Sequence, residues 1–596
     1  MDFENTTKKP SWLRAGDQSI FYWYYKPVDC KASVLLVPSI GHEAYHCHRF
    51  YNRLAEVLCA NNIEVIRFDL PGTQDSLGTV TDKQTFTCWP ECLSLLESQF
   101  QENTDLTLIG FRMGATIADF FCGRSSRVQR FIALEPVLSG KRFSREINAT
   151  SRVSETNSLA EDFLEAGGFQ YTHEFLDWIS TLKLDFSAKK QKVLVYTKSE
   201  RTRKSLERLN LEHVKTQTLR HYEDIIAEPQ FTRIPEDLIF SIVTEITDEQ
   251  PTKVRKPVAL RLSEKAKVEG NDFIESCFTD SLGQFGIITS PTTTQVNRRL
   301  LFVLVNSGSG THTGPNRVYV EISRSLVHSG ITTVRFDMKN LADSYTIGTE
   351  QENHCYPKES THYYDAMIKA LKLEYPDYTF VIGGICSGSH HSFHYALKHG
   401  TNVSAAICIN PLTFYWKEGM SLKTPEEQRT TVDANYYANV IRDPNAWIKL
   451  LKGKANVRYI LLFIQRFITK KTSNLISSMK EILQPIPNTR FNCDIATIRQ
   501  SNTNLEFIIS DSDPGWGLIR DNSMLSKVKF LKRLRVKGHT IPRANHTFSS
   551  QESRRKLCSL LAEILSQYIS DSESKLLQTK LSSSSLPNSS ARAREL

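Results

Sequence analysis

Short apolar runs alternate with stretches of helical periodicity along most of the chain. The first half contains four such runs, at residues 34–37, 65–68, 106–109 and 131–134. The second half contains four more, at residues 301–305, 333–336, 379–382 and 405–409. Runs of this length indicate strands buried on both faces. Because strands that alternate with helices over short connections form parallel sheets, each half is predicted to be a doubly wound α/β fold.

The two halves are copies of one another. Residues 48–76 align without a gap with residues 316–344, at an offset of 268, and nine of the twenty-nine positions are identical. The identical positions include Arg67-Phe68-Asp69 against Arg335-Phe336-Asp337, and Asp75-Ser76 against Asp343-Ser344. Such a repeat predicts two tandem domains of one architecture.

Composition changes along the chain suggest the domain limits. Residues 247–256 are polar, charged and contain proline, so we expect a linker there, between a first domain at 1–246 and a second at 257–570. Residues 571–596 are rich in serine and predict a disordered tail. The second half also has a helix-rich insertion at about 412–504, a place where an α/β sheet carries a lid over its ligand site.

The second half contains a nucleophile motif. Cys386 is the centre of Gly384-Ile385-Cys386-Ser387-Gly388, which follows an apolar strand and precedes a helix. The glycines permit the sharp strand-to-helix turn that lifts the central side chain into the cleft, so Cys386 is the predicted nucleophile. The backbone N–H of Ser387 is the expected oxyanion donor, and a second is expected near Ser309.

An acid and a histidine follow in the order that this motif requires. The apolar run at residues 505–510 is followed by Asp511-Ser512-Asp513, and His546 lies in a loop before the last helix. We predict that Asp513 orients His546, which acts as the base for Cys386, with Asp511 as the alternative acid.

The corresponding turn of the first half has Arg112 at its centre, in Gly110-Phe111-Arg112-Met113-Gly114. Arginine stays protonated and is no nucleophile, so this domain is predicted to be catalytically silent. Two roles remain open for Arg112: it binds an anion at the old active site, or it forms an internal salt bridge with Glu135 or Asp75.

Two histidine clusters have the composition of metal sites without a complete ligand set. His390 and His394 have i, i+4 spacing but no acidic partner, and His42, His46, Cys47 and His48 form a second group. Zinc sites need four ordered ligands or three and water. We therefore expect no metal and no cofactor.

Two motifs resemble those of a known family. Residues 108–118, LIGFRMGATIA, resemble the second type of exosortase A system-associated hydrolases, and residues 383–393, GGICSGSHHSF, resemble the first type. Ser387 stands where the first type usually has an acid. The resemblance implies a serine-aminopeptidase-like α/β-hydrolase fold in each half, with a Cys–Asp–His set at Cys386, Asp513 and His546, and links the chain to exopolysaccharide production.

Composition narrows the setting. The polar first ten residues predict no secretory signal, and the twelve scattered cysteines suit a reducing compartment, so we expect a cytoplasmic protein. The net charge of +9 comes without a dense basic block, so we expect no binding to nucleic acid. Residues 447–471 combine seven basic residues with an apolar face, which indicates either an ordinary lid helix or peripheral membrane contact.

The leading functional hypothesis is a hydrolase or acyltransferase that acts on an ester or thioester, with a small-molecule or carrier-linked acyl substrate. The alternative is a non-enzymatic scaffold of two pseudo-hydrolase domains.

Overall fold

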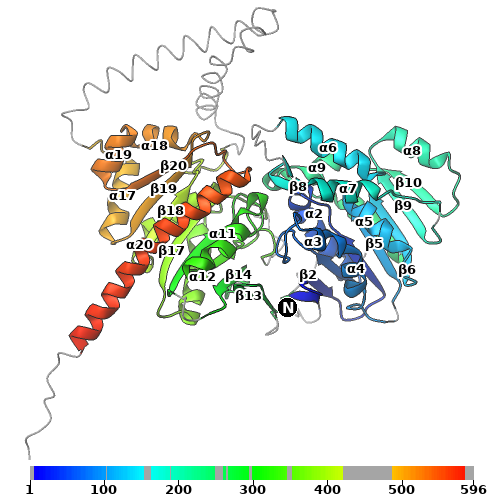
Figure 1. The fold of residues 1–596 in the computed structure, drawn as a ribbon, viewed down its shortest axis with the longest axis horizontal. Coiled ribbons are helices and arrows are strands. Elements are labelled where there is room, and N and C mark those ends of the chain that lie inside the picture. Colours follow the sequence, from blue (N-terminus) through cyan, green and yellow to red (C-terminus); the bar gives the residue numbers. More distant parts are fainter. Residues whose placement is uncertain are drawn as a thin grey trace, which may run out of the picture.

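The computed structural model describes residues 6–102, 104–153, 163–187, 189–248, 259–262, 266–293, 298–344, 352–420 and 486–583. Within these residues the chain forms two nine-stranded sheets, one for each half, and one two-stranded hairpin. Figure 1 shows the two sheets side by side, each flanked by helices.

The first sheet is built from strands of the first half. These are β1 (Thr7–Ala15), β2 (Gln18–Lys26), β3 (Ala32–Val37), β4 (Ile63–Phe68), β5 (Leu106–Phe111), β6 (Val128–Leu134), β9 (Lys192–Thr197), β10 (Val214–Thr218) and the short β11 (Ala259–Leu260). The helices are α1 (His42–His46), α2 (His48–Ala60), α3 (Lys83–Thr87), α4 (Trp89–Glu97), α5 (Met113–Cys122), α6 (Gly140–Val153), α7 (His173–Thr181), α8 (Glu200–Glu207), α9 (Tyr222–Ile226) and α10 (Glu236–Thr247). The hairpin β7 (Phe163–Ala166) and β8 (Phe169–Thr172) and the turn η1 (Pro229–Phe231) complete this half.

The second sheet repeats the plan. Its strands are β12 (Lys267–Glu269), β13 (Phe273–Thr279), β14 (Phe285–Pro291), β15 (Leu300–Val305), β16 (Thr332–Phe336), β17 (Thr379–Ile385), β18 (Ala405–Ile409), β19 (Asn504–Ser510) and β20 (Lys537–Ile541). The helices are α11 (Val318–Leu326), α12 (Ser360–Glu374), α13 (Ser387–His399), α17 (Arg490–Gln500), α18 (Gly515–Ser523), α19 (Lys527–Leu534) and α20 (Gln551–Ser583), with short turns η2 (Pro315–Arg317), η3 (Val327–Ser329) and η4 (Gly400–Asn402).

Both sheets have the same topology. The order is β10-β9-β6-β5-β3-β4-β2-β1 in the first half and β20-β19-β18-β17-β15-β16-β14-β13 in the second, so the third and fourth main strands exchange places in each. The strands from β4 to β10 and from β16 to β20 pair in parallel, and the leading strands pair antiparallel. The predicted pair of α/β-hydrolase-type sheets is confirmed.

Apolar clusters cover both faces of each sheet. Every residue of β4, β5, β15 and β18 is buried, as expected for strands with helices on both sides. One cluster is shared by the two halves: the ring of Phe285 from β14 packs at 4.7 Å from the ring of Trp23 in β2. The repeat therefore brings the leading strands of the two halves into one continuous core.

The predicted lid of the second half differs from the structure at its end. α17, which the sequence put in the lid at about 412–504, buries Phe491, Ile495 and Ile498 in the core next to β19, so the end of that segment belongs to the sheet layer. The middle of the predicted lid, residues 421–485, and with it the basic segment 447–471, lies outside the described residues.

The ends of the second domain also differ. The predicted disordered tail begins inside α20, which continues to Ser583 and in Figure 1 extends beyond the sheet. No glycine or proline interrupts residues 571–583, and this explains the helix. β11, expected in the second domain, pairs with β1 at the edge of the first sheet. In the part of the chain that the structure describes, no helix is long and apolar enough to span a bilayer.

Candidate active site

Cys386 lies at the turn between β17 and α13. Its backbone has φ 60° and ψ −116°, a strained conformation for a residue with a side chain. The flanking glycines permit the turn, because a Cβ on Gly384 would lie 2.8 Å from the backbone of Gly388, and one on Gly388 would lie 2.9 Å from the carbonyl oxygen of Val305. The thiol is thus held, partly exposed, at the N-terminus of α13.

The predicted acid and histidine lie together. His546 Nδ1 is 2.5 Å from Oδ2 of Asp513, whose side chain is fully buried. The other oxygen of Asp513 accepts from the N–H of Gly515 at 2.8 Å, which fixes the carboxylate at the start of α18. The carbonyl oxygen of His546 accepts from the side-chain amide of Asn410 at 2.8 Å. The ring of His546 is therefore positioned by Asp513, and its backbone by Asn410.

The charge of Asp513 controls the protonation of this histidine. Burial lowers the pKa of His546, but the Asp513 carboxylate, through its charge and its hydrogen bond, and the neighbouring Cys386 together raise that pKa well above its ordinary value. Nε2 of His546 is buried and has no partner of hydrogen-bond geometry among the described residues. Because the raised pKa favours the protonated ring, this nitrogen can hold a proton beside Cys386 and the cavity.

Asp511, the alternative acid, binds backbone N–H groups. Its oxygens accept from the backbone N–H groups of Arg543 at 2.8 Å and Ala544 at 3.1 Å. It therefore anchors the loop that carries His546 and is not the partner of the imidazole.

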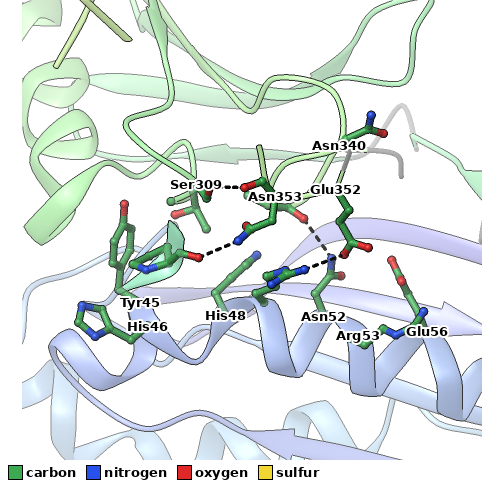
Figure 2. Close-up of a pocket in the computed structure, with 15 residues that line it drawn as sticks. Tyr45, His46, His48, Asn52, Arg53, Glu56, Ser309, Asn340, Glu352 and Asn353 are labelled. Atoms are coloured by element: carbon green, nitrogen blue, oxygen red, sulfur yellow. Dashed lines mark hydrogen bonds and ion pairs between the residues drawn. The ribbon is translucent and has the colours of Figure 1, made fainter. Parts of the chain in front are cut away.

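The two predicted oxyanion residues, Ser387 and Ser309, line different cavities. Ser387 is the first residue of α13, and its hydroxyl accepts from the N–H of Gly308 at 2.8 Å. Ser309 faces a separate small cavity, shown in Figure 2, where its hydroxyl donates to the carbonyl oxygen of Asn353 at 3.0 Å. The loop residues that line the cavity of Cys386 are Ser307 and Gly308. Since Gly308 N–H is engaged, Ser307 is the better candidate for the second donor.

Cys386, Ser387 and His546 line a cavity of about 810 Å³, within the size range of small-molecule sites. The second half contributes Tyr356, Leu412, Thr413, Trp416 and Met420 to it, and the first half contributes residues of α1, β8 and η1. The cavity is therefore formed by both halves.

Tyr356 lies beside the thiol of Cys386, and no motif in the sequence marks it as a site residue. Its ring stacks on Trp416 at a centroid distance of 4.5 Å. Burial raises the pKa of Tyr356 well above its ordinary value, and the charge of the neighbouring Cys386 raises it further. Tyr356 therefore remains a neutral hydrogen-bond donor at the site.

The turn at Arg112 has nearly the same backbone shape as the turn at Cys386. Arg112 has φ 53° and ψ −119°, close to the values of Cys386. Its Nε donates to Glu43 at 2.8 Å and its terminal nitrogen to Glu146 at 2.7 Å. The predicted salt-bridge partners, Glu135 and Asp75, were wrong. The carboxylate of Glu135 accepts from the backbone N–H of Lys198, and the carboxylate of Asp75 contacts His312 of the other half. The guanidinium satisfies two carboxylates of its own domain, which argues against an anion site.

The histidine clusters do not converge on a common point. His390 and His394 face the backbone carbonyls of Thr413 and Phe414, and burial lowers the pKa of both. His46 faces the carbonyl of Ile226, while His48 faces Asp343 of the other half. These contacts give the histidines structural roles.

Comparison with known proteins finds similar chains among solved structures, at low sequence identity. No family model and no curated protein matches the chain. Among solved structures, dienelactone hydrolase from Anabaena variabilis has 11% identity and a TM-score of 0.29, covering 49% of this chain and 97% of its own. Est1E from Butyrivibrio proteoclasticus, with bound ferulic acid, has 15% identity and a TM-score of 0.30, covering 41% and 99%. An alpha-beta serine hydrolase homologue from Coxiella burnetii has 13% identity and a TM-score of 0.28, covering 50% and 99%.

Proposed function

We propose that the chain is an acyl-transfer enzyme, an ester or thioester hydrolase or acyltransferase, with Cys386 as nucleophile, His546 as base and Asp513 as the orienting acid. The observation that carries the proposal is the arrangement of the site. A cysteine at a strained strand-to-helix turn shares one cavity with a histidine that is 2.5 Å from a buried carboxylate. The resemblance of residues 383–393 to the first-type exosortase A system-associated hydrolases supports the same assignment.

The chemistry has two steps. Cys386 transfers its proton to Nε2 of His546, and the sulfur attacks the acyl carbonyl. The C–S bond forms, the bond to the alcohol or thiol breaks, and His546 returns the proton to the leaving group. The N–H of Ser387 and a donor from the loop at Ser307 would stabilise the oxyanion.

The second step releases the acyl group. Water, or an acceptor hydroxyl or amine, gives a proton to His546 as it attacks the acyl-cysteine, and the thiol takes that proton back as it leaves. The products are a carboxylic acid with water, or a new ester or amide with an acceptor. A thioester donor suits a thiol nucleophile because the attacking group and the leaving group are then both thiols, so neither is strongly favoured to leave.

Turnover of p-nitrophenyl esters and of acyl-CoA tests the proposal. We expect wild type to release p-nitrophenolate and to accumulate an acyl adduct on Cys386, located by intact-mass and peptide analysis. Cys386→Ala should abolish both, while Cys493→Ala, which removes an exposed cysteine, should leave both unchanged. Equal turnover by wild type and Cys386→Ala would show that the assignment is wrong.

Labelling by a mild electrophile separates the enzyme from a scaffold of two binding domains. An activated Cys386 should be alkylated by iodoacetamide well before the other eleven cysteines of the chain. If labelling is slow and uniform, the scaffold is the better description.

A further inference from the structure

Three elements of the first half form one wall of the cavity that contains Cys386. Helix α1 contributes His42, Tyr45 and His46, the β7–β8 hairpin contributes Gly167 and Phe169, and η1 contributes Pro229 and Phe231. In the sequence these elements lie at least 150 residues before Cys386. The first half therefore takes part in the site without supplying a reactive group.

The wall is fixed to the loops of the catalytic half by close contacts. The hydroxyl of Tyr45 lies against Gly310, where a Cβ would come within 1.6 Å of it. The carbonyl oxygen of Pro229 accepts from Asn353 at 3.0 Å, a contact drawn in Figure 2. These contacts connect α1 and η1 to the segments that precede α11 and Tyr356.

The hairpin is anchored beside the histidine. Glu165 of β7 accepts from the N–H of Gln551 at 2.9 Å, and the carbonyl oxygen of Gly168 accepts from Arg554 at 3.0 Å. Both partners lie in the first turn of α20, immediately after the loop of His546. The wall and the catalytic loop are thus parts of one packed structure.

The cavity has an apolar mouth formed by both halves. Phe231 from the first half is 38% exposed and Met420 from the second is 36% exposed. Large apolar side chains that are exposed together at a cavity indicate a ligand that covers them. Phe169, Trp416 and Tyr356 add aromatic surface to the same lining.

The charges in the lining argue against an anionic group. Among the described residues that line the cavity, none is lysine or arginine, and Glu228 places a carboxylate there. A phosphate or carboxylate would find no cation at this wall. The surface fits a neutral, hydrophobic group.

We propose that the first half selects the acyl group of the substrate: α1, the β7–β8 hairpin and η1 form the wall of an acyl-binding cavity for a hydrophobic chain, with Phe169 and Phe231 as its specificity residues. This inference rests on the proposed acyl transfer at Cys386 for its link to catalysis. The catalytically silent domain is then a substrate-binding part of the enzyme.

The kinetic test compares p-nitrophenyl acetate with p-nitrophenyl laurate. Phe169→Ala and Phe231→Ala should each raise the KM for laurate, on the order of tenfold, because each removes apolar contacts with the chain. The KM for laurate should rise more than the KM for acetate in each variant, because acetate has no chain that contacts these rings. The control is Phe120→Ala, which removes a phenylalanine of the same half that is 39% exposed and is not part of the cavity lining.

A binding test is independent of turnover. Octyl methyl ketone, which has the shape of an acyl group but no leaving group, should bind to the Cys386→Ala protein, and calorimetry should show weaker binding, on the order of tenfold, when Phe231→Ala or Phe169→Ala is added. Unchanged ketone binding and an unchanged laurate KM in both variants would overturn the inference. If neither ester acylates Cys386 but the ketone binds as described, the proposed reaction fails and the binding wall stands.

Discussion

Arg335 of β16 forms an ion pair with Asp75, a residue of the other half. The counterparts of these residues in the repeat, Arg67 and Asp343, form the reciprocal ion pair across the same interface. An interface in which each half gives the same residues to the other is the arrangement of a two-fold symmetric dimer. The two halves are therefore joined as a pseudo-dimer, and the repeated arginines and aspartates form its centre.

Neutralising one of these buried carboxylates should destabilise the protein. Asp75 is 2% exposed and pairs with Arg335 and His312, so Asp75→Asn removes one of the two carboxylates that each of these buried cations contacts, the others being Glu275 and Asp337. We expect a loss of about 3–5 kcal/mol in the free energy of unfolding. Denaturation by urea, followed by fluorescence, measures it. Lys83→Ala breaks an ion pair between exposed residues and is the control. Shifts of equal size in the two variants would contradict the expected importance of the interface.

The interface should also weaken at high pH. Both ring nitrogens of the buried His312 are 2.8 Å from carboxylates, those of Asp75 and Asp337. Burial lowers the pKa of His312, but the two charges outweigh this and raise it to about 10. Because the folded-state pKa exceeds the unfolded one of about 6.5, the stabilisation is complete below about pH 6.5 and is lost as the pH rises through about 10.

Thermal melting between pH 6 and pH 10 tests this directly. The melting temperature of wild type should fall across the range more steeply than that of His312→Gln, whose glutamine does not titrate. Parallel curves for the two proteins would mean that His312 is neutral in the folded state.

Removing the acid of the catalytic set should reduce turnover and leave substrate binding nearly unchanged. In Asp513→Asn, the pKa of His546 should fall because the carboxylate that raises it is gone. We expect kcat to fall by about 10²–10⁴-fold, with little change in KM. The pH at which iodoacetamide alkylation of Cys386 changes should move as well. Asp511→Asn makes the same chemical change two residues away and removes one of the two oxygens that accept from the loop of His546. It should lose less turnover than Asp513→Asn, and equal losses in both variants would refute the assignment of Asp513.

Arg112 should act on the second half through α1. It holds Glu43, a residue of that helix with a side chain only 8% exposed, and Ser39 also donates to the same carboxylate at 2.7 Å. Arg112→Met should cost about 3 kcal/mol of stability and raise the KM for laurate, since α1 forms part of the acyl wall. Adding Glu43→Gln should recover part of both losses, because it removes the unpaired charge. Arg142→Ala, at the exposed partner of Glu146, should change neither value.

Local patterns were sufficient to select the candidate residues. The Gly-x-Cys-x-Gly turn, the carboxylate three residues after a buried strand and the histidine before the last helix are each recognisable from neighbouring residues, and chain order predicts that they meet at one edge of the sheet. The oxyanion residue is harder to predict, because Ser307, Gly308 and Ser309 are adjacent, and their backbone directions depend on the hydrogen bond between Gly308 and Ser387. The lid limit failed for a similar reason: α17 has a helical pattern, and the pattern alone does not say whether its apolar face packs on a sheet or over a cleft.

The sequence by itself determined the two-fold repeat, the α/β architecture of each half, the silent turn at Arg112 and the candidate set Cys386, Asp513 and His546, because hydrophobic period, glycine spacing and residue chemistry are local properties of the chain. Only the tertiary structure decided that Arg112 pairs with Glu43 and Glu146, that arginines and aspartates are exchanged between the halves, and that α1, β8 and η1 close the cavity of Cys386. These contacts join residues far apart in the chain, and they depend on how two complete sheets pack against each other, which no short pattern encodes.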